Sequence, residues 1–176
     1  EAQEEDLNTI YRNGQHLLAL INEILDMAKI EAGKMTLSFE LVDLSEIART
    51  VHAITVGLVK ESDIALVWNI APQLPKIEAD PIRIRQILIN LLSNAAKFTT
   101  KGQIELAIDE SSNNEVHIAV RDTGIGIAKE NYNKLFAAFE QVDSSTTRVA
   151  GGTGLGLPIT KWLISMHGGS IEVRAS

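Results

Sequence analysis

The segment from Pro81 to Phe98 constrains the fold more than any other, because its sequence, PIRIRQILINLLSNAAKF, predicts one helix with two different faces. Asp80 suits the N-cap of this helix, and Pro81 suits the first turn, where the backbone N–H has no partner inside the helix. Apolar residues at helical spacing form one stripe: Ile84, Ile87, Leu88, Leu91, Leu92 and Ala95. Because such a stripe is stable only when it is buried, another layer of the protein must cover it.

The other face of this helix is polar and consists of Arg83, Gln86, Asn90, Asn94 and Lys97. Asparagine is a poor helix former, so two asparagines four residues apart are an unfavourable choice for a face that only meets water. Amide oxygens are neutral, hard ligands that suit Mg²⁺, which usually takes one or two protein ligands beside nucleotide phosphates. The pattern leaves two interpretations open: a solvated face, or a magnesium nucleotide site in which Lys97 meets a phosphate.

The remaining elements occur in runs rather than in a strict alternation of strand and helix. Alternating apolar residues predict strands at 35–41, 64–71, 103–110, 115–122 and 170–175. Helical spacing predicts two further helices, one at 45–60 and one that follows the glycine-rich residues 151–157 and ends at Met166. This order favours an α+β sandwich over a Rossmann sheet. A chain of 176 residues with 45% hydrophobic content suffices for one compact domain with at most a small appendage.

Residues 1–34 show an apolar repeat of seven residues, which predicts a helix about thirty residues long. One position of the repeat holds Leu7, Gly14, Ile21 and Ala28, and the position three residues later holds Ile10, Leu17 and Ile24. Tyr11, Leu18 and Leu25 widen this face, so it suits a bundle of several helices, and we expect self-association. The helix should end near Gly33, where a domain boundary follows.

Composition and charge exclude several classes of partner and site. The net charge of -7, with no dense block of lysine or arginine, argues against nucleic acid or an anionic membrane as the main partner. The absence of cysteine excludes disulfides, thiolate metal sites and cysteine nucleophiles. The longest apolar runs are too short to span a bilayer, and the first residues do not resemble a signal peptide. We therefore expect a soluble, cytoplasmic fragment whose parent protein is itself soluble or membrane-anchored.

The segment DTGIGI, at residues 122–127, follows directly from a predicted strand. The strand would place the carboxylate of Asp122 rigidly at the end of the sheet, where it suits the amino group of an adenine. Gly124 and Gly126 permit backbone conformations and close approaches that a Cβ forbids. A tight turn needs the same freedom, so this segment alone leaves both a nucleotide cradle and a simple turn open.

A second glycine-rich segment, GGTGLGL at residues 151–157, leads straight into a helix with Pro158 in its first turn. The exposed N–H groups and the dipole at the start of such a helix favour an anion. Neither glycine segment matches the Walker pattern, which ends in Lys-Ser or Lys-Thr, and neither has the spacing of the dinucleotide fingerprint. These two common kinds of phosphate site are therefore excluded.

Four segments, in their order along the chain, resemble the motifs of sensor histidine kinases. RIRQILINLLSNAAKFT resembles the asparagine box, DTGIGI the first glycine box, FAAFEQVDSSTTR the phenylalanine box and GGTGLGLPITKWLISMHGG the second glycine box. LLALINEILDMAKIEAGK resembles the second helix of their dimerisation and histidine-phosphotransfer domain, so the resemblance covers nearly the whole chain. It implies an incomplete dimerisation domain at 1–34 and, at 35–176, the two-layer ATP-binding sandwich shared with type II topoisomerases and MutL.

The resemblance also implies roles for individual residues. Asn94 would bind Mg²⁺, Asn90 and Lys97 would lie near the phosphates of ATP, and the segment 137–152 would form a mobile lid. Asp122 would accept a hydrogen bond from adenine. The other residues expected at the nucleotide are Gly124, Gly126, Ile127, Phe139, Gly152, Thr153, Gly154, Leu155, Gly156 and Leu157.

Three residues of the phenylalanine box have expected roles near the lid. Phe136 and Phe139 would anchor it, although ordinary core positions explain both equally well. Arg148 is a candidate for the γ-phosphate, so the expected catalytic residues are Asn90, Lys97 and Arg148. By resemblance, the γ-phosphate passes to a histidine of the dimerisation domain and then to an aspartate on the receiver domain of a response regulator.

The family places its phosphoacceptor histidine on a helix that is absent from this sequence. The four histidines that are present, His16, His52, His117 and His167, all lack the acceptor context. The sequence also stops after SIEVRAS, where the family usually adds a glycine turn and a strand. We therefore expect a fragment that binds ATP without phosphorylating itself and that forms a homodimer through its N-terminal helix in the full-length protein.

Two other functions compete with this interpretation. An ATP-hydrolysing machine of the topoisomerase or MutL kind places a glutamate four residues before the magnesium asparagine, where this chain has Asn90. An amide cannot take a proton from water, so this alternative is disfavoured. A non-catalytic dimerising signalling module is disfavoured because all four nucleotide motifs look intact.

Overall fold

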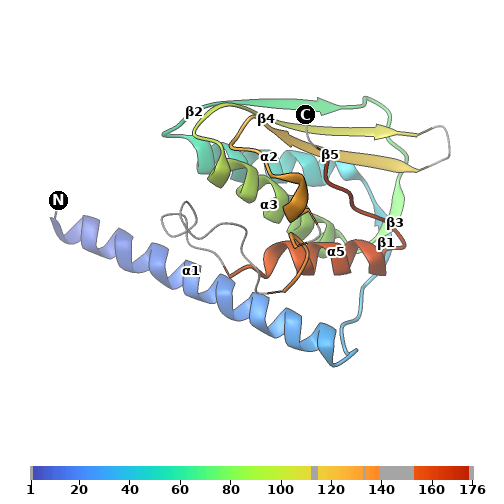
Figure 1. Ribbon diagram of the computed structural model, residues 1–176, viewed down its shortest axis with the longest axis horizontal. Helices are drawn as coiled ribbons and strands as arrows, with labels where there is room; N and C mark the ends of the chain where they lie inside the picture. The colour runs from blue at the N-terminus through green and yellow to red at the C-terminus, as the bar shows by residue number, and fades with distance from the viewer. Residues whose placement is uncertain (1, 112–114, 133, 139–152, 175–176) are drawn as a thin grey trace.

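The computed structural model describes residues 2–111, 115–132, 134–138 and 153–174. The elements follow in the order α1 (Ala2–Glu31), β1 (Glu40–Val42), α2 (Leu44–Val59), β2 (Asp63–Ile70), β3 (Ile77–Ala79), α3 (Pro81–Phe98), β4 (Lys101–Glu110), β5 (Val116–Asp122), the 3-10 turn η1 (Lys129–Asn131) and α5 (Gly156–Met166). In Figure 1, β2, β4 and β5 form one layer, α2 and α3 lie beneath it, and α5 and then α1 lie farther from the sheet. The predicted α+β class is confirmed.

The main sheet has the strand order β2-β4-β5. β2 runs parallel to β4, with Asp63 opposite Lys101, and β4 runs antiparallel to β5, with Ile104 opposite Asp122. β1 and β3 form a separate two-stranded antiparallel sheet. Because pairing continues to the last residue of β5, the sheet fixes the backbone of Asp122 at its edge.

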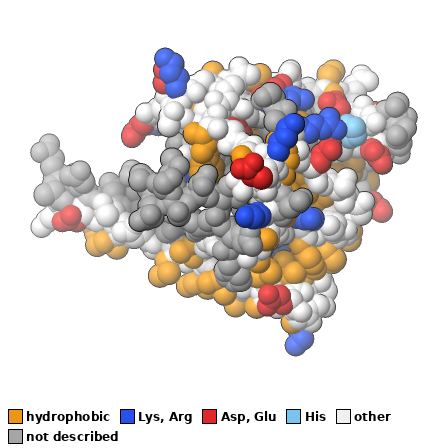
Figure 2. Space-filling model, in the orientation of Figure 1, with side chains coloured by type: hydrophobic (Ala, Val, Ile, Leu, Met, Phe, Trp, Pro, Cys, Tyr) orange, Lys and Arg blue, Asp and Glu red, His pale blue; other side chains and the backbone are white. Residues whose placement is uncertain are grey.

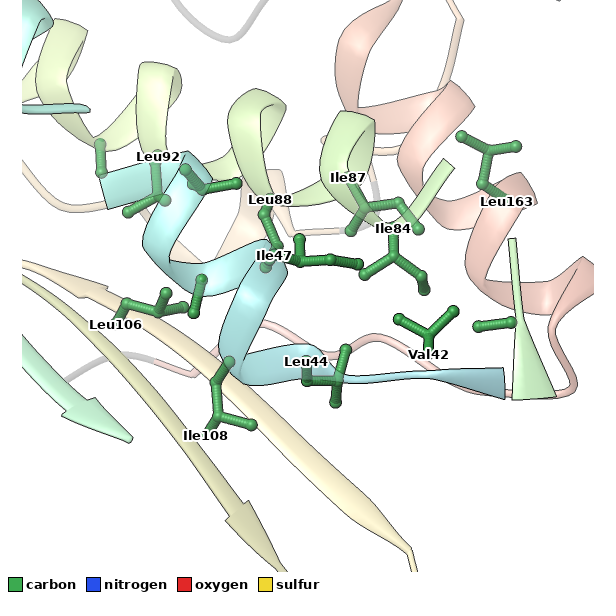
Figure 3. Close-up of a cluster of buried hydrophobic side chains, with 14 of the residues drawn as sticks. Val42, Leu44, Ile47, Ile84, Ile87, Leu88, Leu92, Leu106, Ile108 and Leu163 are labelled. Carbon is green, nitrogen blue, oxygen red and sulfur yellow. The ribbon is translucent and has the colours of Figure 1, made fainter. Parts of the chain in front are cut away.

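The core lies between the main sheet and the helices. Figure 3 shows Leu106 and Ile108 of β4 facing the side chains of Leu44 and Ile47 on α2. Five residues of the predicted α3 stripe are buried, namely Ile84, Ile87, Leu88, Leu92 and Ala95. Leu91, the sixth, is partly buried and packs against this core. The amphipathic pattern therefore predicted correctly which face of α3 turns inward, and the opposite face stays available for polar contacts.

Asp80 fixes the start of α3 through both oxygens of its carboxylate. Its Oδ1 accepts the N–H groups of Ile82 at 3.0 Å and Arg83 at 3.1 Å, as expected of an N-cap. Its Oδ2 accepts the N–H of Ser38 at 2.9 Å, and its own N–H donates to Nε2 of His167 at 3.0 Å. These bonds join the beginning of α3 to the chain before β1 and to the end of α5.

The end of α1 agrees with the sequence prediction. The helix stops at Glu31, and Gly33 adopts a left-handed φ of 63°. The N–H of Lys34 donates to the carbonyl of Lys29 at 2.9 Å, and the N–H of Gly33 donates to that of Ile30 at 3.0 Å, which is the Schellman arrangement. No helix within the described ranges is both long and apolar enough to cross a membrane.

Two strand predictions differ from the structure. In place of a strand at 35–41, only Glu40–Val42 is a strand, because its partner β3 has three residues and the N–H of Ser38 bonds to a side chain instead. Residues 170–174 of the strand predicted at 170–175 are described, and they form no strand. An extended segment becomes a strand only where a neighbour supplies ladder hydrogen bonds, which sequence alternation does not reveal.

Candidate functional site

The polar face of α3 meets the second glycine segment at Asn90. Its Nδ2 donates to the carbonyl of Gly156 at 3.3 Å and to Oγ1 of Thr160 at 3.4 Å, both on α5. A Cβ built on Gly156 would lie 3.7 Å from this nitrogen, which is an ordinary contact. Asn90 therefore joins the middle of α3 to the first turn of α5.

Asn94 and Lys97 continue the same face toward the C-terminal end of α3. Both side chains are half-buried, and Asn94 lies one helical turn beyond Asn90. Nζ of Lys97 lies 5.2 Å from the centroid of the Phe98 ring. Burial lowers the pKa of Lys97, because loss of hydration disfavours its ammonium form. A nearby anion would oppose this effect.

The first glycine segment is fastened to the end of α3. The N–H of Ile125 donates to the carbonyl of Phe98 at 3.2 Å. A Cβ on Gly124 would lie 2.3 Å from this carbonyl oxygen, so only glycine fits here without a shift of the backbone. Gly126 has a φ of 69°, a left-handed conformation that favours glycine. The first glycine segment thus forms a turn, and its backbone lies close to the C-terminal end of α3.

The carboxylate of Asp122 is exposed at the edge of the sheet. Its Oδ1 accepts the N–H of Gly124 at 2.9 Å, which holds the carboxylate in one orientation. An ionised carboxylate has two oxygens and several acceptor positions, so capacity for a ligand remains. Ile127, five residues on, also has an exposed side chain.

The second glycine segment presents backbone rather than apolar side chains to its surroundings. Leu155 is fully buried in the core, so a ligand could reach only its backbone, and Leu157 is half-buried. Gly154 has a left-handed φ of 69°. The hydroxyl of Thr153 accepts the N–H of Leu155 at 3.2 Å. The start of α5 is therefore built around these glycines and one hydroxyl.

Two acidic residues of α1, which the sequence analysis did not select, contact this region. Glu23 accepts a hydrogen bond from the hydroxyl of Thr153. Asp26, only 8% exposed, accepts from Nη1 of Arg83 at 2.8 Å and from Nε2 of Gln86 at 3.0 Å. The sequence signal was their spacing of three residues, which places both on one side of a helix. Their partners depend on the tertiary fold.

A hollow of about 450 Å³ separates α1 from α3 next to these contacts. Its walls are formed by Asn22, Asp26, Ile82, Arg83, Arg85, Gln86, Ile89 and Asn90. It borders Asn90 but includes neither Asn94 nor Asp122. Of the predicted site residues that the structure describes, Asn90 borders this hollow, and the others lie farther along α3 and at the two glycine segments.

Several predictions fall partly or wholly outside the described residues. Phe139, Arg148 and Gly152 are not described, nor is most of the segment 137–152. Phe136 is half-buried, and Nζ of Lys161 lies 5.2 Å from the centroid of its ring. Both interpretations of Phe136, as a lid anchor or as a core residue, therefore stay open.

Comparison with known proteins shows the family of the chain. The model of the histidine kinase-, DNA gyrase B- and HSP90-like ATPases matches residues 79–176, which is more than half of the chain. The chain belongs to this family. The matched residues include α3, both glycine segments and α5, which are the elements that form the candidate site.

Two curated relatives and one solved structure are similar to nearly the whole of this chain. The non-motile and phage-resistance protein of Caulobacter vibrioides is 45% identical over 95% of this chain and 20% of its own length. The circadian input-output histidine kinase CikA of Synechococcus elongatus is 41% identical over 100% of this chain and 24% of its own length. The crystal structure of full-length ShkA in complex with AMPPNP has a TM-score of 0.84 and 34% identity, covering 100% of this chain and 36% of that one.

These matches confirm the identification from sequence as the catalytic, ATP-binding domain of a sensor histidine kinase. The chain spans about a fifth to a quarter of the length of the two curated relatives. The division into 1–34 and 35–176 and the roles of individual site residues stay predictions.

Proposed function

We propose that this chain binds MgATP and presents the γ-phosphate to a histidine imidazole of the dimerisation domain, for onward transfer to an aspartate of a response regulator. One observation supports this most directly: α3 connects both glycine segments, through Phe98 at one end and Asn90 in the middle. Asn94 and Lys97 lie between these two contacts on the same helix. An ATP molecule with its adenine at the first glycine segment and its phosphates at the second would therefore lie along the polar face of α3.

Asp122 is proposed to recognise adenine. The exocyclic amino group of adenine donates hydrogen bonds, and the exposed carboxylate accepts them. The bond from the N–H of Gly124 already fixes the orientation of the carboxylate, so little side-chain freedom is lost on binding. Guanine presents a carbonyl oxygen at the corresponding position, which the carboxylate would repel.

The phosphates are proposed to lie at the start of α5 and near Lys97. The first turn of a helix directs unpaired N–H groups and the positive end of its dipole toward an anion. Lys97 adds a charge whose partial burial strengthens its attraction to a phosphate. Asn90, bonded to the first turn of α5, would hold these two parts of the site in register.

The donor set on α3 fits a magnesium ion that is shared with the nucleotide. The described residues contain no group of three or more His, Cys, Asp or Glu side chains that could hold a metal by themselves. Asn94 offers one half-buried amide oxygen, which suits an ion that completes its shell with waters and phosphate oxygens. The ion would neutralise phosphate charge, and Asn94 would fix its position.

Transfer to an imidazole is favoured over hydrolysis by the chemistry of Asn90. Its amide nitrogen donates to α5 and cannot take a proton from water. An imidazole is itself a good nucleophile, so the protein mainly has to position it in line with the phosphate. Catalysis would rest on this positioning and on neutralisation of charge.

α1 is proposed to mediate homodimer formation. Figure 2 shows hydrophobic side chains gathered along the lower edge of the molecule, over α1. They include Leu7, Ile10, Tyr11, Leu17, Leu18, Ile21, Ile24 and Leu25, each at least 45% exposed. An apolar face of this length is usually covered by other helices, as in a helical bundle, which removes its side chains from water.

Calorimetry followed by a labelling assay tests the proposal. The chain should bind ATP in the presence of Mg²⁺ and prefer it to GTP. Incubation with γ-labelled ATP should leave the chain unlabelled and release little phosphate. Addition of a dimerisation domain with its acceptor histidine should produce acid-labile label on that histidine. Label on His16, His52, His117 or His167, or rapid release of phosphate, would contradict the proposed reaction.

A further inference from the structure

Thr123 follows Asp122 directly and continues the pairing of β5 with β4 beyond the end of the strand. Its N–H donates to the carbonyl of Gln103 at 3.1 Å, in the register that places Ile104 opposite Asp122. The N–H of Gln103 donates to the side-chain hydroxyl of Thr123 at 2.9 Å. In a regular antiparallel pair, this N–H would donate to the backbone carbonyl of the residue opposite. The hydroxyl of Thr123 therefore takes the place of a ladder carbonyl.

This exchange of a carbonyl for a hydroxyl lets the chain leave the sheet immediately after Asp122. Because the side chain of Thr123 supplies the acceptor for β4, the backbone that follows can turn away from the ladder. It does so at Gly124, and the N–H of Ile125 then reaches the carbonyl of Phe98 at 3.2 Å. Asp122 is thus held between the last paired position of the sheet and a turn that packs on α3.

Gly102, at the start of β4, provides the space that the hydroxyl of Thr123 occupies. Its φ of 121° lies in the region that favours glycine. A Cβ at this position would lie 2.1 Å from Oγ1 of Thr123 and 3.3 Å from its Cβ. Any other residue at position 102 would therefore displace the hydroxyl. Gly102 belongs to neither glycine segment, yet its conformation suits this contact.

The carboxylate of Asp122 depends on Thr123 for both its position and its orientation. Thr123 fixes the backbone on the C-terminal side of Asp122. It also precedes Gly124, whose N–H donates to Oδ1 of Asp122 at 2.9 Å and orients the carboxylate. A shift of Thr123 would therefore move the carboxylate and its orienting donor together. Hydrogen bonds weaken steeply when their geometry departs from linear, so such a shift would weaken a bond between the carboxylate and a ligand.

We infer that Thr123 is a positioning residue for the recognition of adenine. Its hydroxyl aims the carboxylate of Asp122 at the exocyclic amino group and so sets the preference for adenine over guanine. Thr123 acts through Asp122 and needs no contact with the nucleotide itself. The inference rests on the proposed function, because it requires that Asp122 recognises adenine. Thr123 is exposed, so loss of its hydroxyl should alter the choice of nucleotide more than the stability of the fold.

Affinities of Thr123 variants for ATP and GTP test this role. Thr123→Val keeps the branched shape but removes the hydroxyl, and the ratio of ATP affinity to GTP affinity should fall about three- to tenfold, part of the loss expected for a bond to a charged group. Thr123→Ser keeps the hydroxyl and should keep the ratio of the parent. Thr50→Val is the matched control, since its hydroxyl donates to the carbonyl of Glu46 at 3.1 Å on the exposed side of α2. Its ratio should also equal that of the parent.

Two further measurements separate positioning from a general structural role. In a chain that carries Asp122→Asn, the additional change Thr123→Val should not lower the ratio further, because residues that act through one group are not additive. Hydrogen exchange followed by NMR reports on the bond itself. The N–H of Gln103 should exchange faster in Thr123→Val than in the parent, and Thr123→Ser should restore its protection.

The possible outcomes distinguish this inference from the proposed function. A parent chain that does not bind ATP, or that does not prefer it to GTP, would overturn the proposed function and this inference with it. A parent that prefers ATP, with the same preference in Thr123→Val, would overturn the role of Thr123 alone. An equal loss in Thr123→Ser and Thr123→Val, a further loss in the Asp122→Asn chain, or unchanged exchange at Gln103 would also overturn that role.

Discussion

The carbonyl oxygen of Phe98 accepts the N–H of Ile125 at 3.2 Å, and this bond joins the C-terminal end of α3 to the first glycine segment. The approach is close because Gly124 has no side chain. A Cβ there would lie 2.3 Å from the same oxygen and 2.9 Å from the carbonyl carbon of Phe98. The glycine is therefore required by packing, whether or not a nucleotide is bound.

Gly124→Ala should destabilise the fold. Backbone atoms of Phe98 cannot move away as the end of a flexible side chain could, so we expect the free energy of unfolding to fall by about 1 to 3 kcal/mol. Gly156→Ala is the control, because its Cβ would lie 3.7 Å from Asn90 Nδ2, and the change should stay within about 0.5 kcal/mol. Urea denaturation of both variants measures the difference. Equal stability would show that the first glycine segment can retreat from α3.

Asp122→Asn should weaken ATP binding while the fold is kept. The amide oxygen of asparagine can still accept the N–H of Gly124, so the turn should persist. An amide NH2 group replaces the second carboxylate oxygen, and this donor faces the amino group of adenine, which is also a donor. Loss of a hydrogen bond to a charged group predicts a loss of affinity of about ten- to a hundredfold. Calorimetry with ATP and GTP checks this, and an unchanged preference for ATP would remove Asp122 from adenine recognition.

The accuracy of sequence analysis depended on the length of each element. α3 has 18 residues, so its apolar stripe repeats several times, and both faces were assigned correctly. β3 has only three residues, too few for a periodicity to appear, and the sequence analysis predicted no element there. The motifs also selected Asn90 and Gly124, and the structure shows that Asn90 bonds to Gly156 of α5 and that Gly124 packs against Phe98.

Contacts between distant segments were beyond prediction from sequence. Arg83 and Gln86 were placed on the polar face of α3, but their partner Asp26 lies 57 positions before Arg83. Glu23 and Thr153 are still farther apart in the sequence. Such pairs depend on the angle at which α1 crosses the other helices, and no local pattern of charge determines that angle.

The affinity for ATP should depend on pH through Lys97. Burial lowers the pKa of its ammonium group in the free protein, and a bound phosphate would favour the charged form and raise that pKa. ATP therefore binds best while Lys97 is protonated, and affinity should fall as the pH rises through the pKa of the free protein. Arginine keeps its charge over the same alkaline range, so the ATP affinity of Lys97→Arg should not change with pH there. Calorimetric titrations at a series of pH values test this, and matching pH profiles in parent and variant would contradict a phosphate contact.

Asn94→Ala should remove the tightening of ATP by Mg²⁺ with little effect on folding. The side chain is half-buried on the polar face of α3, outside the buried stripe, so its loss leaves no core cavity. Without its amide oxygen the ion would keep only its phosphate and water ligands, and its position on α3 would no longer be fixed. ATP affinity measured with Mg²⁺ and with EDTA should therefore differ strongly in the parent and only slightly in Asn94→Ala. Asn69→Ala makes the same change at an exposed position of β2, where the amide donates to Glu105 at 3.0 Å, and it should keep the full effect of Mg²⁺. Equal enhancement by Mg²⁺ in Asn94→Ala and Asn69→Ala would show that the ion is held elsewhere.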